Sequence, residues 1–321
     1  MRGAGRRFLG DSLGLVLVLA TLVVFFGLIT RHFFSFTTLQ TIVNQIPDSL
    51  VIAVGMTFVL VIAGIDLSVG SVLALSGAVL GVCLARLHWP LPPAIVACLF
   101  TGLLAGTVNG AVTVRWALPS FIVTLGMLEA ARGAAYLVTT SQTQYIGEPI
   151  ERIAEAGLFG ISLPFLIAFL IVIIGQTVLS HTTFGRYMLA VGANEETARL
   201  SGVPTRMVRL SVFMISGLLA SVAAVIHCAR MSAADPNTGI GYELNAIAAV
   251  VIGGTSLMGG RGSVANTFLG VLIIAVLQNG LVQAGAQDPT KRIVTGAVIV
   301  AAVIVDYYRR RSGGLTARVG G

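Results

Sequence analysis

Long apolar stretches separated by short polar segments dominate the chain. Windows of about 20 apolar residues, enough to cross a membrane as a helix, recur ten times. The pattern predicts an all-α fold: a polytopic membrane helix bundle of about ten transmembrane helices, some broken or re-entrant. The predicted spans are residues 13–30, 44–63, 67–85, 92–113, 118–138, 162–180, 209–230, 243–258, 264–283 and 291–307.

Two glycine-interrupted phrases stand out within these stretches. VIAGIDLSVG at residues 61–70 contains a single acid, and VIGGTSLMGG at 251–260 matches it at five of ten positions. A carboxylate in the centre of a membrane helix costs ~2.5–3.5 kcal/mol, so an acid between glycines indicates a helix break of the kind that lines a pathway. The alternative for the first phrase is a tight cytoplasmic hairpin in which the acid caps the next helix. Separately, the match between the two phrases could reflect either an internal repeat or low sequence complexity. The predicted helix-break residues are Gly64, Asp66, Gly70, Gly254, Gly259 and Gly260.

Composition supports the membrane assignment. Hydrophobic residues make up 56% of the 321 residues and charged residues 10%, against roughly 45–50% and 25% in soluble domains. The 38 glycines allow helices to approach closely inside a bilayer. We expect one transmembrane domain over residues 1–321.

The net charge of +7 is better explained by membrane topology than by nucleic acid. If the N-terminus is cytoplasmic, thirteen of the twenty basic residues lie in inside segments, as the positive-inside rule requires. Ten spans then place both termini in the cytoplasm, with short tails at residues 1–12 and 308–321. The long segment at residues 181–209 also lies inside.

The chain lacks several signatures of catalysis. A Walker A loop needs Gly-Lys-Ser/Thr, but the single lysine, Lys291, lies in the sequence DPTKR. The dinucleotide pattern GxGxxG and the zinc pattern HExxH are also missing from the sequence, and the three cysteines show no CxxC spacing. We therefore expect no enzyme activity, no metal and no cofactor, so that any ATP used is hydrolysed on a partner.

The segment at residues 181–209 has the pattern of a short helix. Asn194 is a good N-cap, Glu195 and Glu196 suit the positive end of a helix dipole, and Gly202 followed by Pro204 supplies a stop. A helix this short is unstable alone. It must pack either on the membrane face of its own chain or on another subunit.

Four phrases in the right order resemble the ribose-type permeases of bacterial ABC importers: VIAGIDLSVGSVLALSGAV, LPSFIVTLGMLEAARGAAYLVT, TTFGRYMLAVGANEETARLSGVP and ELNAIAAVVIGGTSLMGGRGSV. The resemblance implies a multi-pass subunit of the bacterial inner membrane that translocates a monosaccharide or related polyol such as ribose. It also implies three partners: cytoplasmic ATP-binding subunits, a second permease copy or paralogue, and a periplasmic substrate-binding protein. By this resemblance the ATPase-coupling residues are Gly185, Gly192, Asn194, Glu195, Glu196, Gly202 and Pro204.

A route for hydroxyl-rich solutes calls for amides and hydroxyls rather than fixed charges. Glu129, in the sequence TLGMLEAARGAAY, departs from the resembled family, which usually carries a neutral residue there. It either pairs with Arg132 one helical turn away or faces the route. Ser49, Asn266 and Gln278 are further polar span residues that could line the route. The candidate pathway residues are Asn44, Gln45, Asn109, Glu129, Asn245 and Asn279.

The residues leave two alternative functions open. An ion-coupled secondary transporter would use Asp66 or Glu129 as its ion site. An ABC permease for nucleosides or branched-chain amino acids would share the architecture and differ in the solute. The sequence also leaves open which solute is carried and whether the two permeases are identical.

Overall fold

The computed structural model describes residues 2–30, 33–158, 160–287, 289–298, 300–301 and 304. Within them the chain is almost entirely helical, which confirms the predicted all-α bundle. The helices are α1 (Arg2–Ile29), α2 (Phe36–Gln45), α3 (Pro47–Val61), α4 (Val69–Ala85), α5 (Leu91–Arg115), α6 (Ser120–Thr139), α7 (Glu148–Glu155), α8 (Leu163–His181), α9 (Thr183–Ala193), α10 (Glu195–Leu200), α11 (Thr205–Met231), α12 (Tyr242–Ile252) and α13 (Val264–Gln283). Four two-residue strands, β1 (Gln144–Tyr145), β2 (Gly157–Leu158), β3 (Ile161–Ser162) and β4 (Ala233–Ala234), form two small antiparallel pairs, β1 with β4 and β2 with β3.

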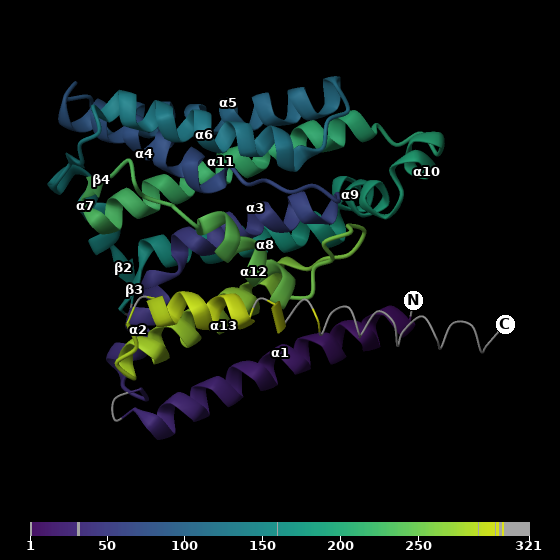
Figure 1. Cartoon of the computed structure of the whole chain (residues 1–321), viewed down its shortest axis with the longest axis horizontal. Helices are drawn as coiled ribbons and strands as arrows, with labels where there is room; N and C mark the ends of the chain where they lie inside the picture. Colours follow the sequence, from purple (N-terminus) through teal and green to yellow (C-terminus); the bar gives the residue numbers. More distant parts are fainter. Residues whose placement is uncertain are drawn as a thin grey trace.

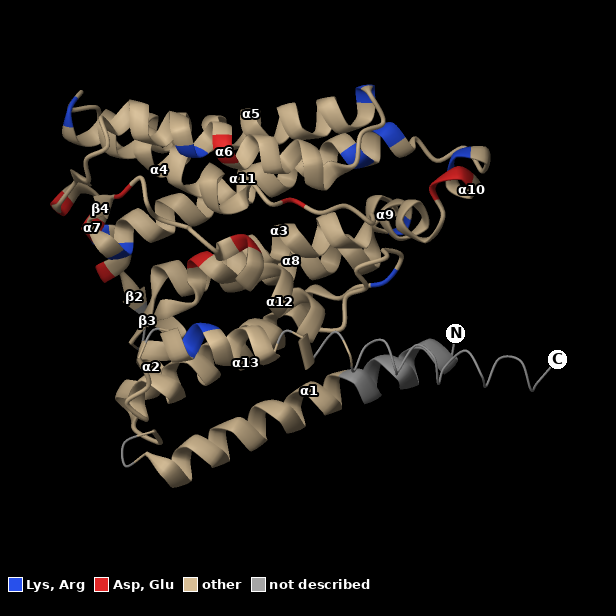
Figure 2. Cartoon of the chain, in the orientation of Figure 1, with Lys and Arg blue, Asp and Glu red and all other residues tan. Residues whose placement is uncertain are grey.

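The long helices lie side by side as one bundle, with α9 and α10 at one end and α7 with the short strands at the other (Figure 1). Six described helices are long and apolar enough to cross a membrane, namely α1, α5, α6, α8, α11 and α13, and the pair α2 and α3 makes a seventh, bent by 48°. Charged residues gather mainly toward the two ends of the bundle (Figure 2). This is the distribution that a bilayer imposes on a spanning protein.

Two predicted spans, the second and the eighth, differ from the structure. The second begins at Phe36 rather than residue 44, because α2 precedes the bend. The eighth, predicted over 243–258, ends as a helix at Ile252, and eleven residues at ~1.5 Å each reach only about half the ~30 Å of a bilayer core. The tenth, predicted over 291–307, is helical at 291–298, 300–301 and 304, the residues of it that the structure describes, and the predicted tail at 308–321 lies outside the described residues. α1 starts at Arg2, so the residues expected to form an N-terminal tail continue the first helix.

The centre of the bundle is α3. All but one of its fifteen residues are buried, which its mainly apolar sequence favours. α5 and α11 approach until their backbones touch, because a Cβ added at Gly102 would overlap the carbonyl of Gly217, and one added at Gly217 would overlap the carbonyl of Gly102. Glycine is therefore required at both positions, as in other close helix pairs within membranes.

The break between α3 and α4 is an irregular segment at residues 62–68 inside the bundle, not an exposed hairpin. The residue with positive φ in this turn is Ala63, at 57°, rather than Gly64 or Gly70. Asp66 is 1% exposed, and its carboxylate accepts hydrogen bonds from the backbone N–H of Ser68 at 3.0 Å, the Ser68 hydroxyl at 2.6 Å and the Ser216 hydroxyl at 2.8 Å. Asp66 is therefore not the N-cap residue that the hairpin alternative requires, because α4 starts at Val69 and its N-cap residue is Ser68.

A second irregular segment, residues 232–241, leads to the short helix α12. Gly241, with φ of 84°, forms the N-cap of α12. Gly70 in the first turn of α4 lies against this segment, because a Cβ at Gly70 would overlap the carbonyl of Gly239. Gly70 is thus needed for close approach rather than for a turn.

Helix α6 supplies hydrogen bonds to both irregular segments. The Ser120 hydroxyl accepts from the N–H of Ile65 at 2.9 Å, and the Thr124 hydroxyl accepts from the N–H of Leu67 at 3.0 Å. Farther along α6, Arg132 donates to the carbonyls of Pro236 at 2.6 Å and Thr238 at 2.7 Å. One spanning helix therefore satisfies backbone groups that no regular helix partner reaches.

The loop between α12 and α13 forms a third irregular segment. Gly254, Gly259 and Gly260 adopt φ of 82°, 78° and 75°, conformations that other residues rarely adopt. The N–H of Gly260 donates to the carbonyl of Val61 at 2.9 Å. The two glycine-interrupted phrases of the sequence therefore meet in space.

We predict that Asp66→Ala lowers the free energy of unfolding by about 1–3 kcal/mol, because it leaves a buried N–H and two hydroxyls without their acceptor. Asp66→Asn should stay close to wild type, since its amide oxygen accepts from Ser68 and its NH₂ can donate to the Ser216 hydroxyl. Denaturation of the purified protein in detergent measures both. Asp235→Ala is the control, because Asp235 makes a similar local contact to Asn237 at an exposed loop. An Asn variant as unstable as the Ala variant would show that the negative charge itself is required.

Candidate functional site

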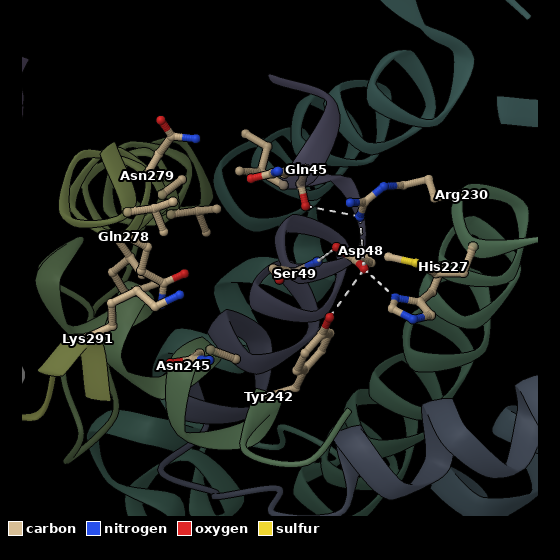
Figure 3. A pocket seen from close by; sticks show the side chains of 18 residues that line it. Gln45, Asp48, Ser49, His227, Arg230, Tyr242, Asn245, Gln278, Asn279 and Lys291 are labelled. Carbon is tan, nitrogen blue, oxygen red and sulfur yellow. Dashed lines mark hydrogen bonds and ion pairs between the residues drawn. The ribbon is translucent and has the colours of Figure 1, made fainter. Parts of the chain in front are cut away.

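A cavity of about 480 Å³ lies between α2, α3, α11, α12 and α13, and we call it the polar chamber. Its walls are apolar where α12 and α13 face each other, through Ala246, Ala249, Val271 and Ile274. Its polar residues converge from five elements and from Lys291 beyond α13 (Figure 3). They are Gln45, Asp48, Ser49, His227, Arg230, Tyr242, Asn245, Gln278, Asn279 and Lys291.

The carboxylate of Asp48 is the centre of this polar set. It is 1% exposed and lies 2.8 Å from Nδ1 of His227, 3.1 Å from a guanidinium nitrogen of Arg230 and 3.5 Å from the hydroxyl of Tyr242. The backbone N–H of Ser49 donates to its other oxygen at 2.8 Å. A buried charge needs partners of this kind, and the position of Asp48 in the first turn of α3 adds favourable interaction with the helix dipole.

Arg230 also fixes the bend between α2 and α3. Its guanidinium donates to the carbonyl of Gln45 at 3.0 Å while pairing with Asp48. Gln45 is the last residue of α2, whose final carbonyls have no helical partner. The same cation therefore satisfies the end of one helix and the acid at the start of the next.

Three amide side chains in the chamber have no hydrogen-bond partner among the described residues: Gln45, Asn245 and Gln278. The Asn279 side chain is engaged, because its oxygen accepts from Gln283 at 3.0 Å. Each free amide offers one acceptor and two donors. The chamber thus combines charges that already satisfy one another with amides that are available to a hydroxyl-bearing ligand.

Three of the predicted pathway residues, Gln45, Asn245 and Asn279, meet in the chamber. The other three do not. Asn44 accepts from the N–H of Ser162 at 3.2 Å, and Asn109 donates to the Ser68 hydroxyl at 2.9 Å beside the α3–α4 break.

Glu129 lies on an exposed part of α6. The ion pair expected between Glu129 and Arg132 is not formed, because the Arg132 guanidinium is directed to the carbonyls of Pro236 and Thr238.

The charged residues of the chamber were not among the sequence candidates. Asp48 is far along the chain from His227, Arg230 and Tyr242, and each of the four adjoins a predicted span end, where a polar or charged residue is unremarkable. An acid directly before an apolar run, in the sequence IPDSLVIAVG, was the one available signal, since ionisable groups at membrane depth are usually functional.

The segment after α8 forms two short helices, α9 and α10, of which only α10 was predicted. The Thr182 hydroxyl caps α9 by accepting from the N–H of Gly185, and the Asn194 side chain caps α10 by accepting from the N–H of Thr197 at 2.9 Å. Glu195 pairs with Arg209 at 2.7 Å, which ties α10 to α11. The chain then turns at Gly202, with φ of 83°, before Pro204 and α11.

Gly192 joins this segment to the irregular segments of the bundle. A Cβ at Gly192 would overlap the carbonyl of Val61 and crowd the N–H of Gly260. The end of α9 is therefore wedged where the two glycine-interrupted phrases meet. Movement of α9 must displace both phrases.

The described residues contain no group of three His, Cys, Asp or Glu side chains that would suit a metal ion. A G-x-S-x-G spacing does occur at residues 10–14, but it lies within α1 rather than on the strand-to-helix turn that a hydrolase requires. Its Ser12 donates to Asn266 at 2.9 Å.

Sequence comparison shows which known proteins this chain is similar to. A family model described as "Branched-chain amino acid transport system / permease component" matches residues 38–303. The ribose import permease protein of Haemophilus influenzae is 37% identical over 307 residues, covering 94% of each chain. The L-arabinose transport system permease protein of Escherichia coli is 34% identical over 94% of this chain and 92% of its own, and the D-allose transport system permease protein of the same organism is 33% identical over 92% and 91%. The chain therefore belongs to this family of multi-pass transport permeases.

Proposed function

We propose that the chain is the transmembrane permease subunit of an ATP-binding cassette importer for a monosaccharide or related polyol, and that the polar chamber contacts the solute. The free amides of Gln45, Asn245 and Gln278, beside charges that are already compensated, carry this proposal. The relatives named for ribose, arabinose and allose support a sugar over the other solutes of the family.

The arrangement suits a neutral, hydroxyl-rich solute. Asp48 is saturated by its own neighbours, so a ligand cation would compete with Arg230 and His227 for it. The amides, in contrast, can donate to and accept from sugar hydroxyls without any change in the charge network.

The proposal also includes the partners of the permease and the way in which ATP hydrolysis drives it. Cytoplasmic ATP-binding subunits would dock on residues 181–209, through the residues around Gly192 and the capped helix α10. Closure of the ATPase pair would push α9 against the two phrases that it touches and shift the bundle between two packings. A periplasmic binding protein would deliver the solute at the α7 end, and residues 1–321 would form a single domain with both termini in the cytoplasm.

The role of the chamber is tested by comparing amides that line it with a neighbouring amide that does not. We expect Gln45→Ala and Asn245→Ala to raise the KM for solute uptake about five- to tenfold, as the loss of one hydrogen bond of ~1 kcal/mol predicts. Asn44→Ala is the matched control, because Asn44 lies outside the chamber and bonds to Ser162. Uptake by cells of equal membrane abundance measures the effect. Equal KM values for all three variants would remove the chamber from the route.

Coupling is tested at Gly192. Gly192→Ala should abolish uptake while the protein still inserts and binds its ATPase, since the added methyl overlaps Val61. Reversal of Glu195 and Glu196 to Arg should weaken the ATPase–transport link for a different reason, the loss of the Arg209 and Arg199 ion pairs. Gly14→Ala, where a Cβ meets nothing within 4 Å, is the control. Normal uptake by Gly192→Ala would show that this contact does not transmit motion.

Topology is tested by reporter fusions. Fusions after Arg186 and after Arg311 should report cytoplasm, and a fusion near Glu151 should report periplasm, as the distribution of basic residues requires. A periplasmic signal after Arg311, which lies outside the described residues, would contradict the ten-span arrangement.

A further inference from the structure

A second cavity, of about 430 Å³, lies beside the polar chamber, and we call it the threonine pocket. Its volume falls in the ~300–1,000 Å³ range of ligand pockets. Every described residue that lines it is polar, and none of them is charged. They are Ser35, Thr37, Thr38, Thr41, Asn279 and Gln283. Hydroxyls and amides of this kind suit a neutral, hydroxyl-rich ligand.

One polar stripe of α2 serves both cavities. Thr37, Thr41 and Gln45 follow one another at four-residue spacing, so they share one side of the helix. Thr37 and Thr41 line the threonine pocket, and Gln45 lines the polar chamber. At ~1.5 Å per residue, Thr37 and Gln45 are only about 12 Å apart along the helix axis. The two cavities are therefore neighbours along the same side of α2.

Helix α13 provides the facing wall. Asn279 lines both cavities, and Gln283, one turn farther along, lines the threonine pocket. Figure 3 shows Asn279 on α13 across the chamber from Arg230, with Gln45 between them. The Gln283 amide donates to the Thr38 hydroxyl at 2.9 Å and to the Asn279 oxygen at 3.0 Å. This tie joins α2 to α13 at the residue that the two cavities share.

A different polar stripe of α2 holds the helix in place. Gln40 donates to the carbonyl of Gly160 at 3.0 Å, and Asn44 accepts from the N–H of Ser162 at 3.2 Å. Both contacts reach the hairpin formed by β2 and β3. The stripe that faces the cavities is therefore not needed to anchor α2 there.

Polar groups of the threonine pocket are available to a ligand. The hydroxyl of Thr37 makes no hydrogen bond to another described residue. The hydroxyl of Thr41 donates to the carbonyl of Thr37 at 2.8 Å, which leaves its oxygen as an acceptor. The NH₂ of Asn279 has no acceptor among the described residues. The pocket thus offers both donors and acceptors.

We propose that the threonine pocket is a second binding site for the solute, a neutral monosaccharide or polyol, which passes Asn279 between this site and the polar chamber. The class of solute rests on the proposed function. Sugar hydroxyls donate to the Thr41 oxygen and accept from Asn279 and Gln283. A sugar that accepts from Gln283 replaces the bond to Thr38 and releases the tie between α2 and α13.

Protection of single cysteines from a water-soluble maleimide tests the site, with the full chain in membranes and D-ribose as the probe. Thr37→Cys reports the threonine pocket and Ser49→Cys the polar chamber. D-ribose should slow the labelling of both in a saturable way, about twofold at its Kd, where half of the sites are occupied. Gln142→Cys is the control, because Gln142 is exposed and lines neither cavity. The three native cysteines are buried, and the parent chain reports their background.

The outcomes separate this proposal from the proposed function. Protection of Ser49→Cys alone would overturn the second site and leave the chamber in the route. Protection of Thr37→Cys alone would support the second site and contradict the role of the chamber. Protection at neither position, or equal slowing at Gln142→Cys, would overturn the second site.

The contribution of the Thr41 hydroxyl is tested in the Thr37→Cys background. Thr41→Val keeps the shape of the side chain and should raise the Kd of D-ribose for protection about fivefold, through the loss of one hydrogen bond. Thr21→Val is the matched control, because the Thr21 hydroxyl donates to the carbonyl of Leu17 at 2.8 Å in the same way on α1. An unchanged Kd with Thr41→Val, or an equal rise with Thr21→Val, would contradict the site.

Discussion

Irregular backbone packed inside a helix bundle must find hydrogen-bond partners, and this constraint organises the structure. Helical geometry supplies those partners elsewhere, yet this chain leaves it at residues 62–68 and 232–241. Side chains from other helices supply the missing partners. Ser120 and Thr124 serve the first segment, and Arg132 serves the second. Asp66 adds a buried acceptor for its own segment and for α11.

The same constraint explains where backbones touch. Where a helix is interrupted, another segment can pack directly against its backbone, and glycine allows this because it has no side chain. Gly70 admits the segment before α12, and Gly192 admits the end of α9 to the point where Val61 and Gly260 meet. Packed contacts of this kind switch between discrete arrangements rather than deforming smoothly. The arrangement therefore suits a protein that must change its packing when a partner pushes on α9.

In the polar chamber, the residues that stabilise the structure differ from the residues that are available to a ligand. Its charges stabilise the structure: Asp48 and Arg230 satisfy each other and fix the bend between α2 and α3. Its amides remain available for a ligand.

The sequence by itself determined the membrane bundle, the breaks and the capped helix α10. Each of these follows from local chemistry: apolar length, glycine with an acid, and Asn194 followed by two glutamates. Tertiary structure decided which polar residues meet, and it corrected several predictions. Asn109 bonds to Ser68 at the α3–α4 break, Glu129 is exposed on α6, and α12 is only about half as long as a bilayer core is thick. The chamber needs residues from five elements, and no local pattern records how those helices are rotated against one another. That rotation depends on the shapes of buried side chains and the positions of glycines, which act only once the helices are in contact.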